Sequence, residues 1–572
     1  MFFRTCPASA VLVILPLLIA TGCSRTSERP FERVAFVPFE NLSSDSRATW
    51  MGSAVAGIAA AQTEGNSKIR TFDVSALREA WALRADRIVT GYITSLDGKL
   101  TAHGSIRDEQ TLKTVRAFAI SAPESDIVAL ATGVARETGA PVRDWYTHNA
   151  VAIRAYFEAR SVQSPADAIA LLDKAITADP SFGAAHVARI ELLTRSGNRD
   201  AALASLPAAE QLKLSDSDRA RLELTAAQAR DDASGQVAAL TTLARIQGAN
   251  PQAWRSVAEG QMLLKDYRAA AEAAGHVLDL EPRDEAMLNL RGYALGFAGD
   301  LPGARQAFEQ YRRSYPDSAN PIDSLGEVLF YHRRYDEAGK LFLEAGTKDP
   351  QALNGAEPFR AAVCRILLKD IAGADRLFRQ YIEVRQQAHD PLVALREAIW
   401  KRMTGRAAQA PDDALGLATN ALWAVADGDR NRARSMAETA RRAAVSPAEV
   451  ALASTAWLLA QPSAPAQAWE SRIAAALPGA QQSKARTQLL GWALLLDRHY
   501  ADAVGIWRSE WQSSSALTGN EARMLLTWSL VEAGQMEEAK KTMPYGWMPP
   551  TGPEPGLNVL FYPTIPNIRT RF

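Results

Sequence analysis

Residues 285–318 read EAMLNLRGYALGFAGDLPGARQAFEQYRRSYPDS, and this stretch shows the pattern on which most of the chain is built. It holds two runs in which apolar residues recur at helical spacing, with Gly-Asp between them and a proline near the end. The pattern has a fixed period, because Pro282, Pro316 and Pro350 lie 34 residues apart. A period of this length predicts a stack of units, each made of two antiparallel helices.

The same register extends towards the N-terminus. One position can be followed through six units, at Ala168, Ala202, Gln236, Ala270, Ala304 and Ala338. Six units therefore share one frame over residues 149–350. Small residues here, and at Gly292 and Gly326, let paired helices approach closely, and proline ends the second helix because it lacks an N–H. Beyond residue 350 the period slips, since Ala374 follows Ala338 by 36 residues.

These features resemble the tetratricopeptide repeat (TPR) family. The resemblance implies a mainly α fold, a TPR-type α-solenoid preceded by a small α/β domain. We expect a first TPR array over residues 149–404 and a second, TPR-like array over 411–543, with an irregular joint at 405–412. The Pro-rich tail, 544–572, is expected to be extended and to pack on the last repeat through Trp547, Phe561 and Tyr562.

The TPR resemblance also implies a concave groove lined by the first helices of the units. The family's groove-facing positions fall on Arg255, Glu259, Asn289, Tyr293, Asp323, Glu327 and Phe330. Mixed polar and aromatic side chains suit a protein or peptide partner. The Lys and Asn set of the carboxylate-clamp subfamily is not matched, so a chaperone C-terminus is not the expected ligand. The alternative interpretation is that these residues form solvated helix faces.

The N-terminus has the pattern of an export signal. Arg4 precedes an apolar run over residues 8–20, which is too short to span a bilayer. The run ends in LIATGC, residues 18–23, which resembles the lipobox of bacterial lipoproteins. That resemblance implies a signal peptide at 1–22, a lipid on Cys23 and a tether at 23–31. Ser24 in place of Asp favours the outer membrane, facing the periplasm. An ordinary secretory signal that ends in Cys is the alternative.

Residues 32–142 predict a small α/β domain in the order β-α-β-α-β-β-β-α. The expected strands are 33–39, 69–72, 87–94, 99–107 and 112–120, and the helices are 48–61, 75–84 and 123–138. Asp97-Gly98 predicts a tight hairpin turn. The segments VAFVPFENLS (34–43) and IVTGYI (88–93) resemble the N-terminal module of TolB/CsgG/FlgO-like envelope proteins. The resemblance implies an assembly or interaction role, with no catalysis.

Composition and motifs narrow the function. The chain has 64 Lys and Arg against 64 Asp and Glu, which gives no reason to expect nucleic acid. It carries no GxSxG, P-loop, GxGxxG, HExxH or Cys/His cluster, so we expect neither an enzyme, a cofactor nor a bound metal. Cys364 lies in an apolar helical run and is expected to be buried.

The sequence thus favours a membrane-anchored lipoprotein of the bacterial cell envelope that acts as an assembly or recruitment scaffold. Its TPR groove would bind a protein partner, and the lipid on Cys23 would anchor the chain in the membrane. One alternative is a sensory or regulatory ligand-binding module. The other is an envelope enzyme with an unrecognised site.

Overall fold

A computed structural model describes residues 31–42, 49–64, 68–248, 250–478, 483–514, 519–543 and 545–560. The predicted signal peptide, Cys23 and the side chains of Phe561 and Tyr562 lie outside this part of the chain. The described residues fall into two compact units. The first comprises residues up to Leu192 with Gln211–Lys213, and the second comprises Leu193–Glu210 and the residues from Leu214 onwards.

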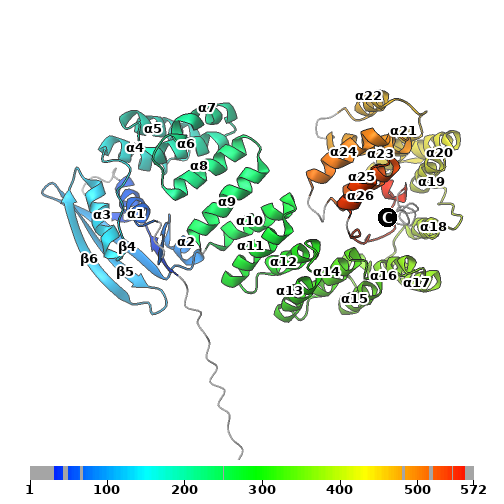
Figure 1. The fold of residues 1–572 in the computed structure, drawn as a ribbon, viewed down its shortest axis with the longest axis horizontal. Helices are drawn as coiled ribbons and strands as arrows, with labels where there is room; N and C mark the ends of the chain where they lie inside the picture. The colour runs from blue at the N-terminus through cyan, green and yellow to red at the C-terminus, as the bar shows by residue number, and fades with distance from the viewer. Residues whose placement is uncertain are drawn as a thin grey trace, which may run out of the picture. The chain divides into compact units, whose positions relative to one another are not determined.

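The first unit contains the predicted α/β domain (Figure 1). Its elements are β1 (Glu32–Phe36), β2 (Glu40–Asn41), α1 (Trp50–Gln62), β3 (Ile69–Asp73), α2 (Leu77–Ala82), β4 (Arg87–Leu96), β5 (Lys99–Asp108), β6 (Thr114–Pro123) and α3 (Ile127–Glu137). The strand order is β3-β1-β4-β5-β6, with β2 paired to β4. β1 is parallel to β3 and β4, whereas β4, β5 and β6 are antiparallel. The predicted order is confirmed, and the two-residue strand β2 is an addition.

Local sequence accounts for the sheet. Asp97 and Gly98 have φ of 52° and 72°, which confirms the predicted hairpin turn between β4 and β5. The helices α1 and α3 contact each other and share one apolar core with the sheet, while α2 covers a smaller cluster that includes Ala35 and Ile88. The PFEN segment fits tightly here, because a Cβ at Gly52 would stand 1.8 Å from the Phe39 carbonyl oxygen.

Most of the remaining described chain is helical. The helices are α4 (Ala150–Ala159), α5 (Pro165–Ala178), α6 (Gly183–Arg195), α7 (Arg199–Glu210), α8 (Asp216–Ala229), α9 (Ala233–Gln247), α10 (Pro251–Leu264), α11 (Tyr267–Leu280), α12 (Glu285–Phe297), α13 (Leu301–Ser314), α14 (Asn320–Tyr331), α15 (Tyr335–Lys348), α16 (Glu357–Leu367), α17 (Ile371–Gln387), α18 (Val393–Met403), α19 (Ala414–Ala426), α20 (Arg430–Ala443), α21 (Pro447–Leu459), α22 (Ala466–Ala476), α23 (Ser483–Leu496), α24 (Tyr500–Gln512), α25 (Asn520–Glu532) and α26 (Met536–Thr542). Short 3-10 helices η1 (Ala352–Asn354) and η3 (Leu557–Leu560) complete the set.

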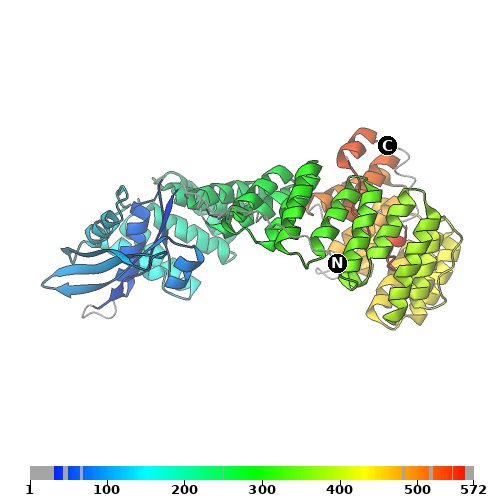
Figure 2. The same cartoon turned by 90° about the horizontal axis from the view of Figure 1, so that it is seen from below.

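The helix boundaries confirm the predicted register. In each of the first six helix-pair repeats, the second helix begins 34 residues after the second helix of the repeat before it, at residues 165, 199, 233, 267, 301 and 335. The next, α17, begins at residue 371, which is 36 after 335 and confirms the slip. The fold class is therefore confirmed: a mainly α chain with a TPR-type solenoid after a small α/β domain. Figure 2 shows successive green and yellow-green helices of the second unit stacked side by side.

Close contact within a helix pair rests on a glycine facing an aromatic ring 16 residues later. A Cβ at Gly292 would stand 2.5 Å from Cζ of Phe308, and one at Gly326 would stand 2.7 Å from Cε1 of Phe342. Such distances leave no room for a methyl group, so the ring fills the space that glycine provides. This confirms the role predicted for both glycines.

Helix pairs continue in the second array, although the 34-residue period has slipped. The predicted pairs around α19–α20, α23–α24 and α25–α26 are confirmed, and two helices that the pattern did not mark, α21 and α22, lie between them. Residues 406–411 are non-helical, as expected for the joint. Asn420 holds this joint, because its side chain accepts from the Ala410 N–H at 3.0 Å and donates to the Ala410 carbonyl at 3.1 Å.

The second unit returns on itself, so that its last helices meet helices far earlier in the sequence. Lys265, at the end of α10, lies 4.5 Å from the centre of the Trp511 ring and donates to the Gln512 carbonyl at 3.2 Å. Arg523 of α25 donates to the Tyr331 hydroxyl at 3.3 Å. These contacts bring α24 and α25 against the ends of α10 and α14.

Cys364 is buried in α16, with 1% of its surface exposed, which confirms the expectation. Burial raises the pKa of its thiol to about 12, so the reactive thiolate is scarce at neutral pH.

Within the described ranges, every helix falls short of the length and apolar character needed to cross a bilayer.

We predict that Gly326→Ala lowers the free energy of unfolding by about 1–3 kcal/mol, because the new methyl group must displace the Phe342 ring. Gly505→Ala is the matched control. Gly505 also lies inside a helix, α24, but a Cβ there meets nothing within 4 Å, so helix propensity makes the change neutral or stabilising by up to about 1 kcal/mol. Urea denaturation of both variants checks this, and equal effects would contradict the close-contact explanation.

Candidate protein-binding groove

The seven predicted groove residues lie on three first helices of the second unit. Arg255 and Glu259 are on α10, Asn289 and Tyr293 on α12, and Asp323, Glu327 and Phe330 on α14. Glu259 alone of the seven is exposed. Arg255 pairs with Glu281 at 3.1 Å and also with Asp284, whereas Tyr293 and Phe330 are buried.

The acidic members of the predicted set meet an arginine that sequence reasoning missed. Arg360, on α16, is fully buried and its two terminal nitrogens bind the carboxylates of Asp323 and Glu327. Its guanidinium also lies 4.3 Å from the centre of the Phe342 ring. Glu357 adds a third carboxylate, with Oε1 3.4 Å from Arg360 Nη1.

The repeat register gave no signal for this cluster. α16 ends 36 residues after α14 ends, and α17 begins 36 residues after α15 begins, so Gly326 corresponds to Ala362 and Arg360 corresponds to Ser324. Only the tertiary structure brings Arg360 and Glu357 to the two acids of α14.

One guanidinium cannot neutralise three buried carboxylates, and the pKa values respond accordingly. Burial, with the charge of Asp323, raises the pKa of Glu357 to about 8. Burial also raises the pKa of Asp323 to about 6, although the positive charge of Arg360 opposes the change. The raised pKa of Glu357 therefore favours its protonated form, which relieves the repulsion between its carboxyl group and that of Asp323.

Phe330 is covered by the C-terminal segment. Trp547, 3% exposed, packs edge-on against Phe330 with ring centres 5.9 Å apart. Tail residues also contact α25 of the last helix pair, since Asn520 bonds to Met548. Trp547 packs on Phe330 of α14 and shares a buried cluster with residues of α25, because the return of the second unit brings α14 and α25 together.

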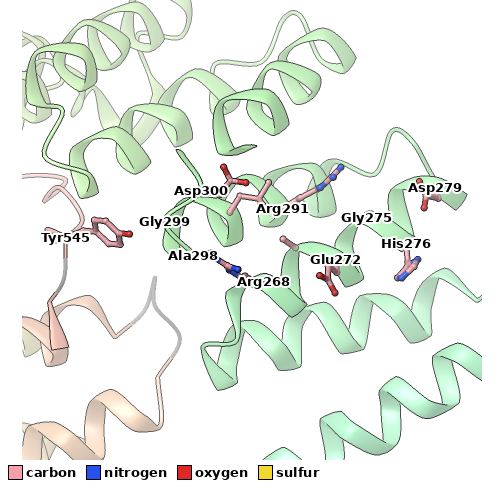
Figure 3. Close-up of a pocket in the computed structure, with 12 residues that line it drawn as sticks. Arg268, Glu272, Gly275, His276, Asp279, Arg291, Ala298, Gly299, Asp300 and Tyr545 are labelled. Atoms are coloured by element: carbon pink, nitrogen blue, oxygen red, sulfur yellow. The ribbon is translucent and has the colours of Figure 1, made fainter. Parts of the chain in front are cut away.

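An open cleft of about 940 Å³ lies beside these contacts, between α11 and α12 (Figure 3). Its walls carry Arg268, Glu272, His276, Asp279, Arg291 and Tyr545 among others. Arg268 and Arg291 form no ion pair with the described chain, and Nε of Arg291 is buried with no hydrogen-bond partner there. Only the return of the tail makes Tyr545 a wall of the cleft, so the repeat pattern does not place it there.

No protein-family model matches the chain, and no curated protein matches it. Among solved structures, MamA of Desulfovibrio magneticus RS-1 is 17% identical over 30% of this chain and 97% of its own, with a TM-score of 0.25.

Two other solved structures are similar at the same level. YrrB, described as a TPR protein with an unusual peptide-binding site, is 18% identical over 31% of this chain and 92% of its own, with a TM-score of 0.26. A structure of Naa15/Naa10 bound to HypK-THB is 11% identical over 69% of this chain and 68% of its own, with a TM-score of 0.36. These are partial likenesses in fold.

We predict that the second unit loses stability as pH rises from about 5 to about 8.5. The pKa of Glu357 is raised in the folded state, so folding favours its protonated form below that pKa and is weakened as the proton leaves. Glu357→Gln mimics the protonated form. It should unfold like the wild type near pH 5 and be more stable by about 1–3 kcal/mol near pH 8.5.

The measurement is the urea midpoint of each protein across this pH range. Glu259→Gln, an exposed change on α10, is the matched control and should follow the wild type throughout. Parallel curves for the wild type and Glu357→Gln would contradict the assignment of the proton to Glu357.

Proposed function

We propose that this chain is a protein-binding scaffold of the bacterial cell envelope, held at a membrane by a lipid on Cys23 and facing the periplasm. The scaffold part rests on the second unit. Its repeat helices leave a cleft in which Arg268 and Arg291 have no ion partner in the described chain. Glu272, Asp279 and Asp300 line the same cleft, so it suits a partner segment that carries both carboxylates and basic groups.

One observation carries the proposal furthest: the repeat helices already hold an extended segment by its main chain. Asn520 of α25 accepts from the Met548 N–H at 3.1 Å and donates to its carbonyl at 3.5 Å. Side chains that bond to main-chain groups are the chemistry by which a groove recognises a peptide. The open cleft continues from this bound segment, because Tyr545 is one of its walls.

The lipid anchor rests on the lipobox resemblance alone, because Cys23 lies outside the described residues. We predict that the protein expressed in a Gram-negative host incorporates labelled palmitate and fractionates with membranes. Cys23→Ala should lose both properties, since the thiol that accepts the diacylglycerol is gone. Cys6→Ala, which changes a cysteine inside the predicted signal peptide, is the control and should retain both. Label retained in Cys23→Ala would overturn the anchor.

The sensory alternative predicts a small ligand in place of a protein, and the enzyme alternative predicts turnover of one. Both would leave the protein without a stable protein partner in its native envelope. The partner experiment therefore separates the scaffold from the two alternatives.

We predict that crosslinking in the native envelope captures a partner through the cleft. The double variant Arg268→Glu/Arg291→Glu should reduce that capture by about tenfold or more, because two charge contacts become repulsive. Arg376→Glu/Arg432→Glu is the matched control, since these exposed arginines lie on α17 and α20 away from the cleft. Mass spectrometry quantifies the captured protein.

A partner that both double variants retain would move the binding surface to the α/β domain or the C-terminal repeats. The absence of any partner from the wild type would count against the scaffold and favour a small ligand.

A further inference from the structure

Residues 545–556, YGWMPPTGPEPG, run through the second unit without helix or strand, and side chains of other elements hold their main chain. Arg333 donates to the Tyr545 carbonyl at 2.6 Å, and Arg523 donates to the Gly546 carbonyl at 2.7 Å. Asn520 bonds to both main-chain groups of Met548. We name Arg333, Asn520 and Arg523 the backbone-binding strip. Bonds of this kind depend on an extended backbone and little on its side chains.

Two aromatic side chains anchor the segment at its first end. The Tyr545 ring lies 4.5 Å from the His332 ring, and Trp547 packs on Phe330. Between them the backbone passes so close to α14 that a Cβ at residue 546 would stand 2.8 Å from the Tyr331 carbonyl oxygen. The site therefore selects an aromatic residue, then glycine, then tryptophan.

The second end of the segment is fixed by charge. Glu554, 47% exposed, binds the buried guanidinium of Arg396 on α18 at 2.5 Å. Between the two ends lie Pro549, Pro550 and Pro553. Proline favours an extended backbone and lowers the entropy that an ordered segment loses on binding. These are the properties of a recognised peptide, here supplied by the same chain.

The open cleft gives a second molecule access to the bound segment. Tyr545 forms one wall of the cleft and is also the first anchor of the segment. A partner chain that enters between α11 and α12 meets Tyr545 before it meets the rest of the segment. It can thus replace the aromatic anchor first and then the main-chain bonds of the strip.

We propose that the backbone-binding strip is a recognition site for an extended, proline-rich partner segment with the order aromatic–glycine–tryptophan. In the isolated chain residues 545–556 occupy the site, and a partner segment of the same chemistry displaces them. This inference rests on the proposed function, because it names the kind of partner that the groove takes.

The test uses the full chain and a fluorescein-labelled synthetic peptide of residues 545–556. Trp547→Ala removes the largest anchor of the resident segment and should open the site to the labelled peptide, read by fluorescence anisotropy. Wild-type protein should bind the peptide about tenfold or more weakly, because its own segment competes. Adding Asn520→Ala to Trp547→Ala should lower peptide affinity by about tenfold, because the two bonds to Met548 are lost.

Two controls make the outcome specific. A peptide with valine at the position of Gly546 should not bind, because of the nearby Tyr331 carbonyl. Glu554→Lys is a second way to weaken the resident segment, at an exposed side chain that the apolar core does not need. It should also admit the peptide, and it serves if Trp547→Ala does not fold.

Folded Trp547→Ala and Glu554→Lys proteins that both exclude the peptide would overturn the inference and make residues 545–556 a permanent part of the core. Equal binding of the peptides with glycine and valine would overturn it as well. Neither result would contradict the scaffold proposal if the envelope partner is still captured through Arg268 and Arg291.

Discussion

The contact on which the second unit depends is that of a glycine in one helix with an aromatic ring 16 residues later. It occurs at Gly292 with Phe308, at Gly326 with Phe342 and, after the register slip, at Gly491 with Trp507, where a Cβ would stand 2.6 Å from the ring. Each ring fills the space that the missing side chain leaves, so the two helices approach closely and the pair becomes one stackable element. Each helix pair packs mainly against the pairs next to it, so this repeated contact sets the geometry of the groove and of the cleft.

A buried ion cluster explains the closed part of the groove. Arg360 of α16 reaches over the Phe342 ring to the acids of α14 in the preceding repeat. Asp323 and Glu357 meet in the same cluster, where two buried carboxylates repel each other. A buried pair of this kind adds little net stability, but removing one partner leaves a costly unpaired charge. The cluster thus fixes the packing of α16 against α14, and it buries side chains that were predicted to face the groove.

Asparagine side chains hold the non-helical segments of the second unit. Asn420 binds both main-chain groups of Ala410 in the joint, and Asn520 does the same for Met548 in the tail. A carboxamide offers one acceptor and one donor, which matches the two groups of a peptide unit. Such bonds satisfy backbone groups that would otherwise be buried without a partner, and they allow an extended segment to lie against a helical surface. The same chemistry makes this surface suitable for an extended segment of another protein.

The local and periodic features of this protein could be predicted from the order of its residues. The spacing of prolines and small residues predicted the 34-residue interval that separates the second helices from residue 165 to 335, and Asp97-Gly98 predicted the turn of the α/β hairpin, because both depend on residues close together in the chain. Which of the predicted groove residues remain exposed depends on contacts between residues far apart in the chain. Arg360 closes over Asp323 and Glu327, and Trp547 covers Phe330 from more than two hundred residues away. A 34-residue pattern describes the contacts between adjacent units, but the return of α25 and the tail to α14 is a sum of small rotations over many units, which the period does not encode.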